Sequence, residues 1–232
     1  MARRASVVLG VMMIAAGCRR QADSIASVGS ASSQAVKVNA PATSATAPES
    51  SIVQADGFSH YSDPPRADVG LSVDQAYAAI PHRRTAWTES ETSVPASERV
   101  YLKTIFGVVD EAIAMRVAGL QNFSQQRFDT VDVDGQLDQL ISFTRSMPVP
   151  TRLGVYHGQV LAALAADRQF FAEWKAQGAA FPYAQRIAAN GDVQAASAAA
   201  RAAYSELMSK YPGESQANKD AFFDYHCALD FL

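Results

Sequence analysis

Apolar side chains recur at steps of three and four along most of the second half of the chain, the period of an amphipathic helix. From Ala96 onward one such stripe comprises Leu102, Phe106, Val109, Ile113, Val117, Leu120 and Phe123. A second stripe, in a helix expected from Thr151 to Gly178, comprises Leu153, Tyr156, Val160, Leu164, Phe171 and Trp174. Convincing alternation of apolar and polar residues, typical of a strand, is missing. The pattern therefore predicts an all-α fold.

Shorter helices are expected around these two long ones. They fall at residues 73–80, from residue 132 or 134 through residue 144, at residues 181–189, from Asp192 to Tyr211, and from about Ser215 onward. Ser72, Asp132 or Asp134, and Asp192 are the expected N-caps, because their side chains can accept hydrogen bonds from free helical amides. Four or five main helices joined by short turns predict an antiparallel bundle.

The first eighteen residues follow a different pattern. Arg3 and Arg4 precede a short apolar run, and Ala15-Ala16-Gly17 lead directly into Cys18. The run is too short for a permanent membrane-spanning helix. The stretch resembles the signal of bacterial lipoproteins, in which the cysteine after a small-residue box is lipidated and becomes the new N-terminus. The resemblance implies a removed signal peptide at residues 1–17 and a lipid anchor, with acyl chains such as palmitate, at Cys18.

Two residues of this stretch bear on where the protein resides and on whether Cys18 is lipidated. By the same resemblance, Arg19 in place of Asp after the cysteine favours the outer membrane, facing the periplasm. Ala15 departs from the Leu that the box usually carries at that place. An ordinary secretory signal shows the same positive, apolar and small-residue regions, and Cys18 would then carry no lipid.

The next segment, residues 18–56, is rich in Ala and Ser and contains no aromatic residue. It cannot bury enough apolar surface to offset the entropy of ordering, so we expect a disordered tether. Residues 57–95 are expected to be irregular apart from the short helix at 73–80. Residues 96–232 are expected to form the bundle, with residues 67–95 packed against it.

The charge content bears on nucleic-acid binding, and the cysteine content bears on disulfide formation. The chain has 20 basic and 23 acidic residues, which gives no reason to expect a nucleic-acid partner. Cys227 is the second of two cysteines. If Cys18 is lipidated, no intramolecular disulfide is available, and we expect Cys227 to be a small buried apolar side chain rather than a reactive thiol.

Two sets of residues are candidate metal ligands. In the segment from Thr130 to Ile141, Asp132 and Asp134 fall on the third and fifth places of a calcium loop, but its first and twelfth places lack a carboxylate. We interpret both aspartates as helix-capping residues. His157 and His226 lie on different predicted helices and could meet at a metal or a haem iron. No known motif supports that site, and a histidine at a helix interface more commonly forms a hydrogen bond there.

The densest group of recognition residues is His82, Arg83, Arg84 and Trp87. It could contact an acidic partner, a phosphate or a sugar, with Trp87 as the aromatic anchor. In the alternative interpretation, Trp87 plugs the bundle and the arginines pair with carboxylates such as Asp110 and Glu111.

No nucleophile elbow, phosphate-binding glycine loop or paired carboxylates identify a catalytic residue. The sequence therefore predicts a lipid-anchored envelope protein that binds another protein without catalysis, as an envelope assembly factor or a periplasmic inhibitor of the immunity type. It predicts no cofactor and no small-molecule substrate. The alternatives are a metal- or haem-binding bundle and, after that, an enzyme that uses the region of His82.

Overall fold

The computed structural model of the protein describes residues 61–80, 82–181 and 187–230. The predicted signal peptide, Cys18 and the predicted tether lie outside these ranges. The described residues form helices α1 (Val73–Ala79), α2 (Ala96–Phe123), α3 (Val133–Ser146), α4 (Gly154–Gln177), α6 (Gly191–Lys210) and α7 (Gln216–Leu229). Short 3-10 turns occupy Glu89–Glu91, Thr151–Leu153, Gly178–Ala180 and Ile187–Ala189. These ranges contain no strand, so the all-α prediction is confirmed.

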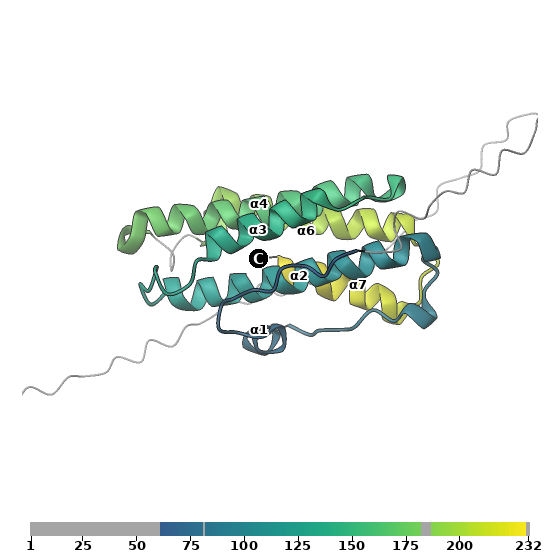
Figure 1. Cartoon of the computed structure of the whole chain (residues 1–232), viewed down its shortest axis with the longest axis horizontal. Helices are drawn as coiled ribbons and strands as arrows, with labels where there is room; N and C mark the ends of the chain where they lie inside the picture. Colours follow the sequence, from purple (N-terminus) through teal and green to yellow (C-terminus); the bar gives the residue numbers. More distant parts are fainter. Residues whose placement is uncertain (1–60, 81, 182–186, 231–232) are drawn as a thin grey trace, which may run out of the picture. The chain divides into compact units, whose positions relative to one another are not determined.

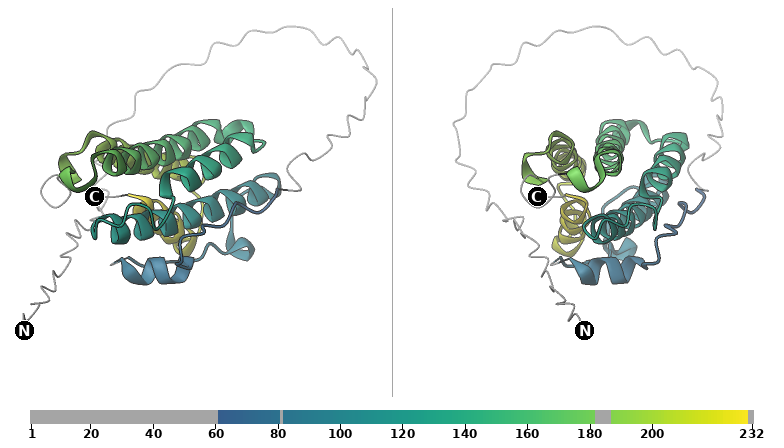
Figure 2. Two further views of the ribbon diagram at one scale, coloured as in Figure 1. Left: turned by 60° about the vertical axis from the view of Figure 1, so that its left-hand side comes forward. Right: turned by 90° about the vertical axis from the view of Figure 1, so that its left-hand side faces the viewer.

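The five longer helices form a bundle in which consecutive helices run antiparallel (Figure 1). α4 packs most extensively against α6, while α3 lies against α2 and α4. α7 closes the bundle by packing against both α6 and α2 (Figure 2). None of the helices in the described ranges has both the length and the apolar composition needed to cross a bilayer. The predicted antiparallel bundle is confirmed.

α2 is the most enclosed of these helices. Its predicted apolar stripe is buried apart from Leu120, which is half-buried, but residues on its other faces, such as Val108, Ala112 and Met115, are buried as well. α1, α3, α4 and α7 all contact it, so nearly its whole circumference is covered. A single stripe was therefore too narrow a prediction for this helix, although it gave both ends of the helix correctly.

Several helix ends follow the expected capping chemistry, and others do not. The side chain of Ser72 accepts from the amide of Gln75 at the start of α1, as predicted. At the start of α6 the cap is Asn190 rather than Asp192, because the helix begins at Gly191 and the Asn190 side chain accepts from the next two free amides. Of the helix expected at 181–189, residues 182–186 lie outside the described ranges and Ile187–Ala189 form a 3-10 turn.

The segment before the bundle, residues 61–95, is here named the strap. It runs along α2 in one direction, turns through α1 and returns to the beginning of α2 (Figure 1). Tyr61 contacts Tyr101 edge to face, and the amide of Ala67 donates to Glu111 further along α2 at 2.7 Å. On the return, the backbone of Thr88 exchanges two hydrogen bonds with the side chain of Asn218 on α7. The strap thus covers α2 and ties it to α7.

Candidate functional site

The four recognition residues predicted from the sequence all lie on the returning half of the strap, just after α1. Arg84 is held by two carboxylates, those of Asp74 and Asp110, each at 2.6 Å. Asp110 is buried in α2 and also accepts a hydrogen bond of 3.1 Å from the Tyr77 hydroxyl. Burial raises the pKa of Asp110, and the guanidinium of Arg84 opposes that rise. Arg84 therefore compensates a buried charge.

His82 and Trp87 are also occupied by contacts within the chain. The Nε2–H of His82 donates to the backbone carbonyl of Asp224 on α7 at 2.8 Å, and the hydroxyl of Thr85 donates to the Asp224 carboxylate. The indole of Trp87 is half-buried and packs edge to face on Phe106, with ring centroids 5.9 Å apart. Two parts of the alternative interpretation match these contacts, since Trp87 packs on the bundle and Arg84 pairs with Asp110. Glu111, however, accepts from the amide of Ala67 instead of from an arginine.

Arg83 differs from its neighbours. Its side chain is exposed and makes no ion pair, hydrogen bond or ring contact with the described residues. The residues on either side of it are anchored, His82 to α7 and Arg84 to α1 and α2. The backbone of Arg83 is therefore held in place while its guanidinium points into solvent. Of the four candidate partner-binding residues, it alone has a polar group that is both exposed and unpartnered among the described residues, since the unpartnered indole N–H of Trp87 is buried.

The two candidate metal-binding histidines face different neighbours. His157 follows Tyr156 by one position on α4, so the two side chains point about 100° apart around the helix. His157 Nδ1 is hydrogen-bonded to the hydroxyl of Tyr101 on α2 at 3.0 Å. Tyr156 instead packs edge to face against His226 of α7, with ring centroids 5.6 Å apart. The structure thus does not pair His157 with His226.

His226 is buried and incompletely hydrogen-bonded. Its Nδ1–H donates to the carbonyl of Phe222 at 2.6 Å, while its Nε2 has no hydrogen-bond partner among the described residues. Burial lowers the pKa of His226 to about 4, so the ring is neutral near pH 7 and Nε2 carries a lone pair. The hydroxyl of the neighbouring Tyr156, which is fully buried, is likewise unpartnered within the described part of the chain. Both atoms are thus buried polar atoms whose hydrogen-bonding capacity is unused within the described residues.

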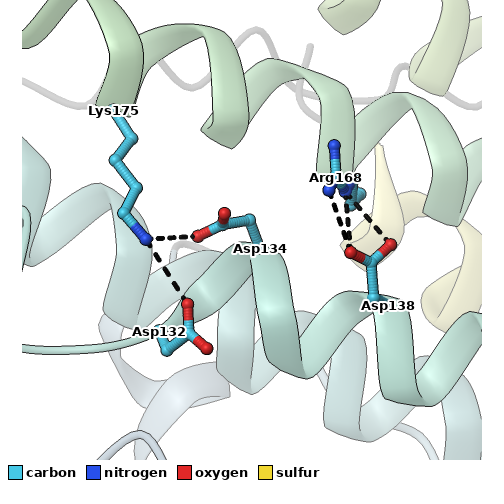
Figure 3. Close-up of polar contacts among 5 residues, drawn as sticks. All are labelled: Asp132, Asp134, Asp138, Arg168 and Lys175. Atoms are coloured by element: carbon cyan, nitrogen blue, oxygen red, sulfur yellow. Dashed lines mark hydrogen bonds and ion pairs between the residues drawn. The ribbon is translucent and has the colours of Figure 1, made fainter.

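The aspartates of the calcium-loop segment pair with basic side chains of α4 (Figure 3). Lys175 Nζ lies 2.9 Å from Asp134 and 3.4 Å from Asp132. One turn further along α3, Asp138 binds Arg168 through both carboxylate oxygens at 2.9–3.2 Å. Asp132 does occupy the N-cap position of α3, but its side chain makes no capping hydrogen bond. These ion pairs join α3 to α4, a role that neither the calcium nor the capping interpretation included.

A buried charged cluster was missed in the sequence. Asp167 on α4 is 1% exposed, and neither of its carboxylate oxygens has a hydrogen-bond partner in the described ranges. Arg116 on α2 is also buried and donates to the backbone carbonyls of Ala228 and Asp230 at the end of α7. The sequence did contain a signal for this buried charge. Asp167 lies three residues after Leu164 and four before Phe171, on the predicted apolar stripe. A charge at such a position is costly unless it is compensated or neutralised.

Among the described residues, no group of three or more His, Cys, Asp or Glu side chains could hold a metal ion. Cys227 is half-buried and disulfide-bonded in the structure. The expectation that Cys227 takes part in no disulfide is therefore contradicted. An intramolecular disulfide at Cys227 and lipidation at Cys18 would require the same sulfur, because the chain has only these two cysteines.

Comparison with protein-family models, with curated protein sequences and with solved structures found no match.

Proposed function

We propose that this chain is a lipid-anchored envelope protein whose bundle binds another protein through the strap surface around Arg83. The lipid anchor rests on the sequence at Ala16-Gly17-Cys18, and the tether of residues 18–56 would hold the bundle away from the membrane. Outer-membrane attachment facing the periplasm belongs to the same proposal. A non-catalytic role as an assembly factor or as an inhibitor of the immunity type fits a tethered bundle.

One observation carries the binding site, namely the exposed guanidinium of Arg83 between two anchored neighbours. Binding orders flexible groups at a free-energy cost, and a backbone that is already fixed reduces it. Arginine is among the residue types enriched at the energetic centres of protein interfaces. Its planar fork binds a carboxylate through two parallel hydrogen bonds, so the expected counterpart is an acidic side chain of the partner.

The proposal is tested by site-specific photo-crosslinking in the bacterial host. A photoreactive residue would replace Arg83 in one variant and Gly158 in the other. Gly158 is a matched control because it is exposed on α4 and its Cβ position is open. We expect a discrete protein adduct from position 83 that is absent from position 158 and is reduced in the Cys18→Ser variant. Equal labelling from both positions, or none from position 83, would count against the strap as the binding surface.

A second candidate function, metal or haem binding, has one observation in its favour. A ligating histidine usually donates its other ring N–H to a carbonyl or carboxylate, and His226 already does so to Phe222 while its Nε2 lone pair is unpartnered. His157 does not share this site, whereas Tyr156, whose hydroxyl is also buried and unpartnered in the described structure, packs against His226. Elemental and absorbance analysis of the full chain purified without chelator tests this candidate. A stoichiometric metal or haem band lost in the His226→Phe variant, but kept in His157→Phe, would support it; a colourless, metal-free protein would exclude it.

A further inference from the structure

In the charged cluster at the end of α7, the guanidinium of Arg116 lies near two kinds of acceptor among the described residues, the closing carbonyls of α7 and the carboxyl group of Asp167. Arg116 donates to three consecutive carbonyls that close α7, those of Ala228, Leu229 at 3.5 Å, and Asp230 at 2.7 Å. These are carbonyls for which the helix has no further amide, so a cation placed there stabilises the end of α7. Arg116 thus acts as a C-terminal cap that is supplied by another helix.

The second possible acceptor is Asp167. It lies close enough for the guanidinium of Arg116 to favour its ionised form, yet both of its oxygens lack hydrogen bonds in the described structure. Burial, opposed by the guanidinium of Arg116 and assisted by the Asp230 carboxylate, raises the pKa of Asp167 to about 8. The carboxyl group is therefore mainly protonated at neutral pH, and a neutral carboxyl attracts the guanidinium much less than a carboxylate does.

Ionisation of Asp167 turns its carboxyl group into a stronger acceptor for the guanidinium of Arg116. The bonds of Arg116 to the carbonyls have only one charged partner, the guanidinium, whereas a carboxylate would add a second, opposite charge, whose attraction is stronger in the interior than in water. An unpaired carboxylate in the interior is costly, so the nearest cation is drawn toward it. Arg201 on α6 is not the available cation, because it already binds the Asp230 carboxylate at 2.8 Å. The basic residues Arg168 and Lys175 on α4 are bound to the aspartates of α3.

We propose that Arg116 binds the end of α7 while Asp167 is protonated and turns to Asp167 when that carboxyl ionises, so that the last turn of α7 is released in mildly alkaline solution. This inference does not depend on the proposed partner binding. It would make the α7 terminus, and with it the neighbourhood of Asp224 where the strap is attached, sensitive to the pH outside the bundle.

Hydrogen exchange of the full chain in detergent tests the proposal. The amide of Asp230, which bonds to the carbonyls of His226 and Cys227, reports on the last turn of α7. Its exchange rate in the wild type would be compared at each pH with that in the Asp167→Asn variant, so that intrinsic base catalysis cancels. We expect nearly equal rates at pH 6.5, where only about 3% of Asp167 is ionised, and a wild-type excess of at least about tenfold at pH 9, where about 90% is ionised and the last turn is released. Equal rates throughout would overturn the proposal.

A control variant and an NMR titration complete this test. Asp138→Asn removes an ion pair that holds α3 to α4, away from the end of α7, and should leave the wild-type behaviour of the Asp230 amide unchanged. If Asp167→Asn does not fold, the carboxyl carbon of Asp167 can be followed by NMR in the wild type. A midpoint near pH 8 with a simultaneous shift of the amides at 228–230 supports the proposal. A midpoint below pH 5, or titration without change in α7, overturns it.

Discussion

Arg83 and Arg84 are neighbours in the chain, but their environments are opposite. Arg84 compensates the buried carboxylate of Asp110, whereas Arg83 is exposed and makes no hydrogen bond, ion pair or ring contact with the described residues. The sequence could predict that a strap arginine pairs with Asp110, but it could not tell which one. That choice depends on the turn after α1, and turn geometry has no periodic signature in the sequence. For the same reason, Asn190 rather than Asp192 caps α6.

The two arginines give a matched pair of variants. We expect Arg84→Gln to lower the free energy of unfolding by about 1–3 kcal/mol, because Asp110 remains buried without its cation. Arg83→Gln should change it by less than about 0.5 kcal/mol, as is usual for surface positions. Urea unfolding followed by circular dichroism measures both. Equal losses in the two variants would show that Arg84 does not support the fold in the way described.

Asp167 predicts a pH dependence of stability. Its folded pKa of about 8 lies above the value near 3.9 of an unfolded chain. The folded state therefore holds the proton more tightly, and this contribution is complete below about pH 4 and is lost as the pH rises to about 8. Relative to Asp167→Asn, the wild type should lose roughly 2–5 kcal/mol between pH 4 and pH 8. Parallel stability curves for the two proteins, measured by urea unfolding across this range, would contradict the assignment.

At the scale of helices, the contact of α2 with α4 depends on the absence of a side chain at Gly119. A Cβ there would lie 2.5 Å from a ring carbon of Phe171. The apolar periodicity predicted both helices and the burial of Phe171, because that periodicity follows directly from helix geometry. It could not predict how closely the two helices approach, since this depends on how residues distant in the chain interlock. The charged pairs between α3 and α4 were missed for the same reason.

Two glycine substitutions test this close approach. We expect Gly119→Ala to destabilise the fold by about 1–3 kcal/mol, because the ring of Phe171 would have to move within a filled core. Gly158→Ala is the matched control, since that helical position is open and alanine favours a helix by up to about 1 kcal/mol over glycine. Thermal unfolding should place the midpoints of the two variants on opposite sides of the wild type. A neutral Gly119→Ala substitution would mean that the two helices are less tightly packed than described.

At the scale of the whole molecule, the all-α fold class and the antiparallel arrangement of the bundle could be predicted from the sequence. Which strap residues contact the bundle and which stay exposed could not be predicted. Three of the four predicted recognition residues hold the returning half of the strap to α1, α2 and α7, which leaves Arg83 as the candidate contact. The proposed place of the molecule in a bacterial envelope depends on Cys18, which lies outside the described residues. Cys227, meanwhile, is disulfide-bonded in the structure. Lipidation and an intramolecular disulfide cannot share the Cys18 sulfur.

Intact-mass spectrometry of the full-length gene product, isolated from the membranes of a bacterial host without reductant, decides this point. We expect a chain that begins at Cys18 and carries the added mass of a lipid, and a Cys18→Ser variant that leaves the membrane fraction. Cys227 would then be a free thiol or be bonded to a second molecule. A chain without lipid, in which Cys18 and Cys227 form one disulfide, would contradict the lipid anchor and the envelope role built on it.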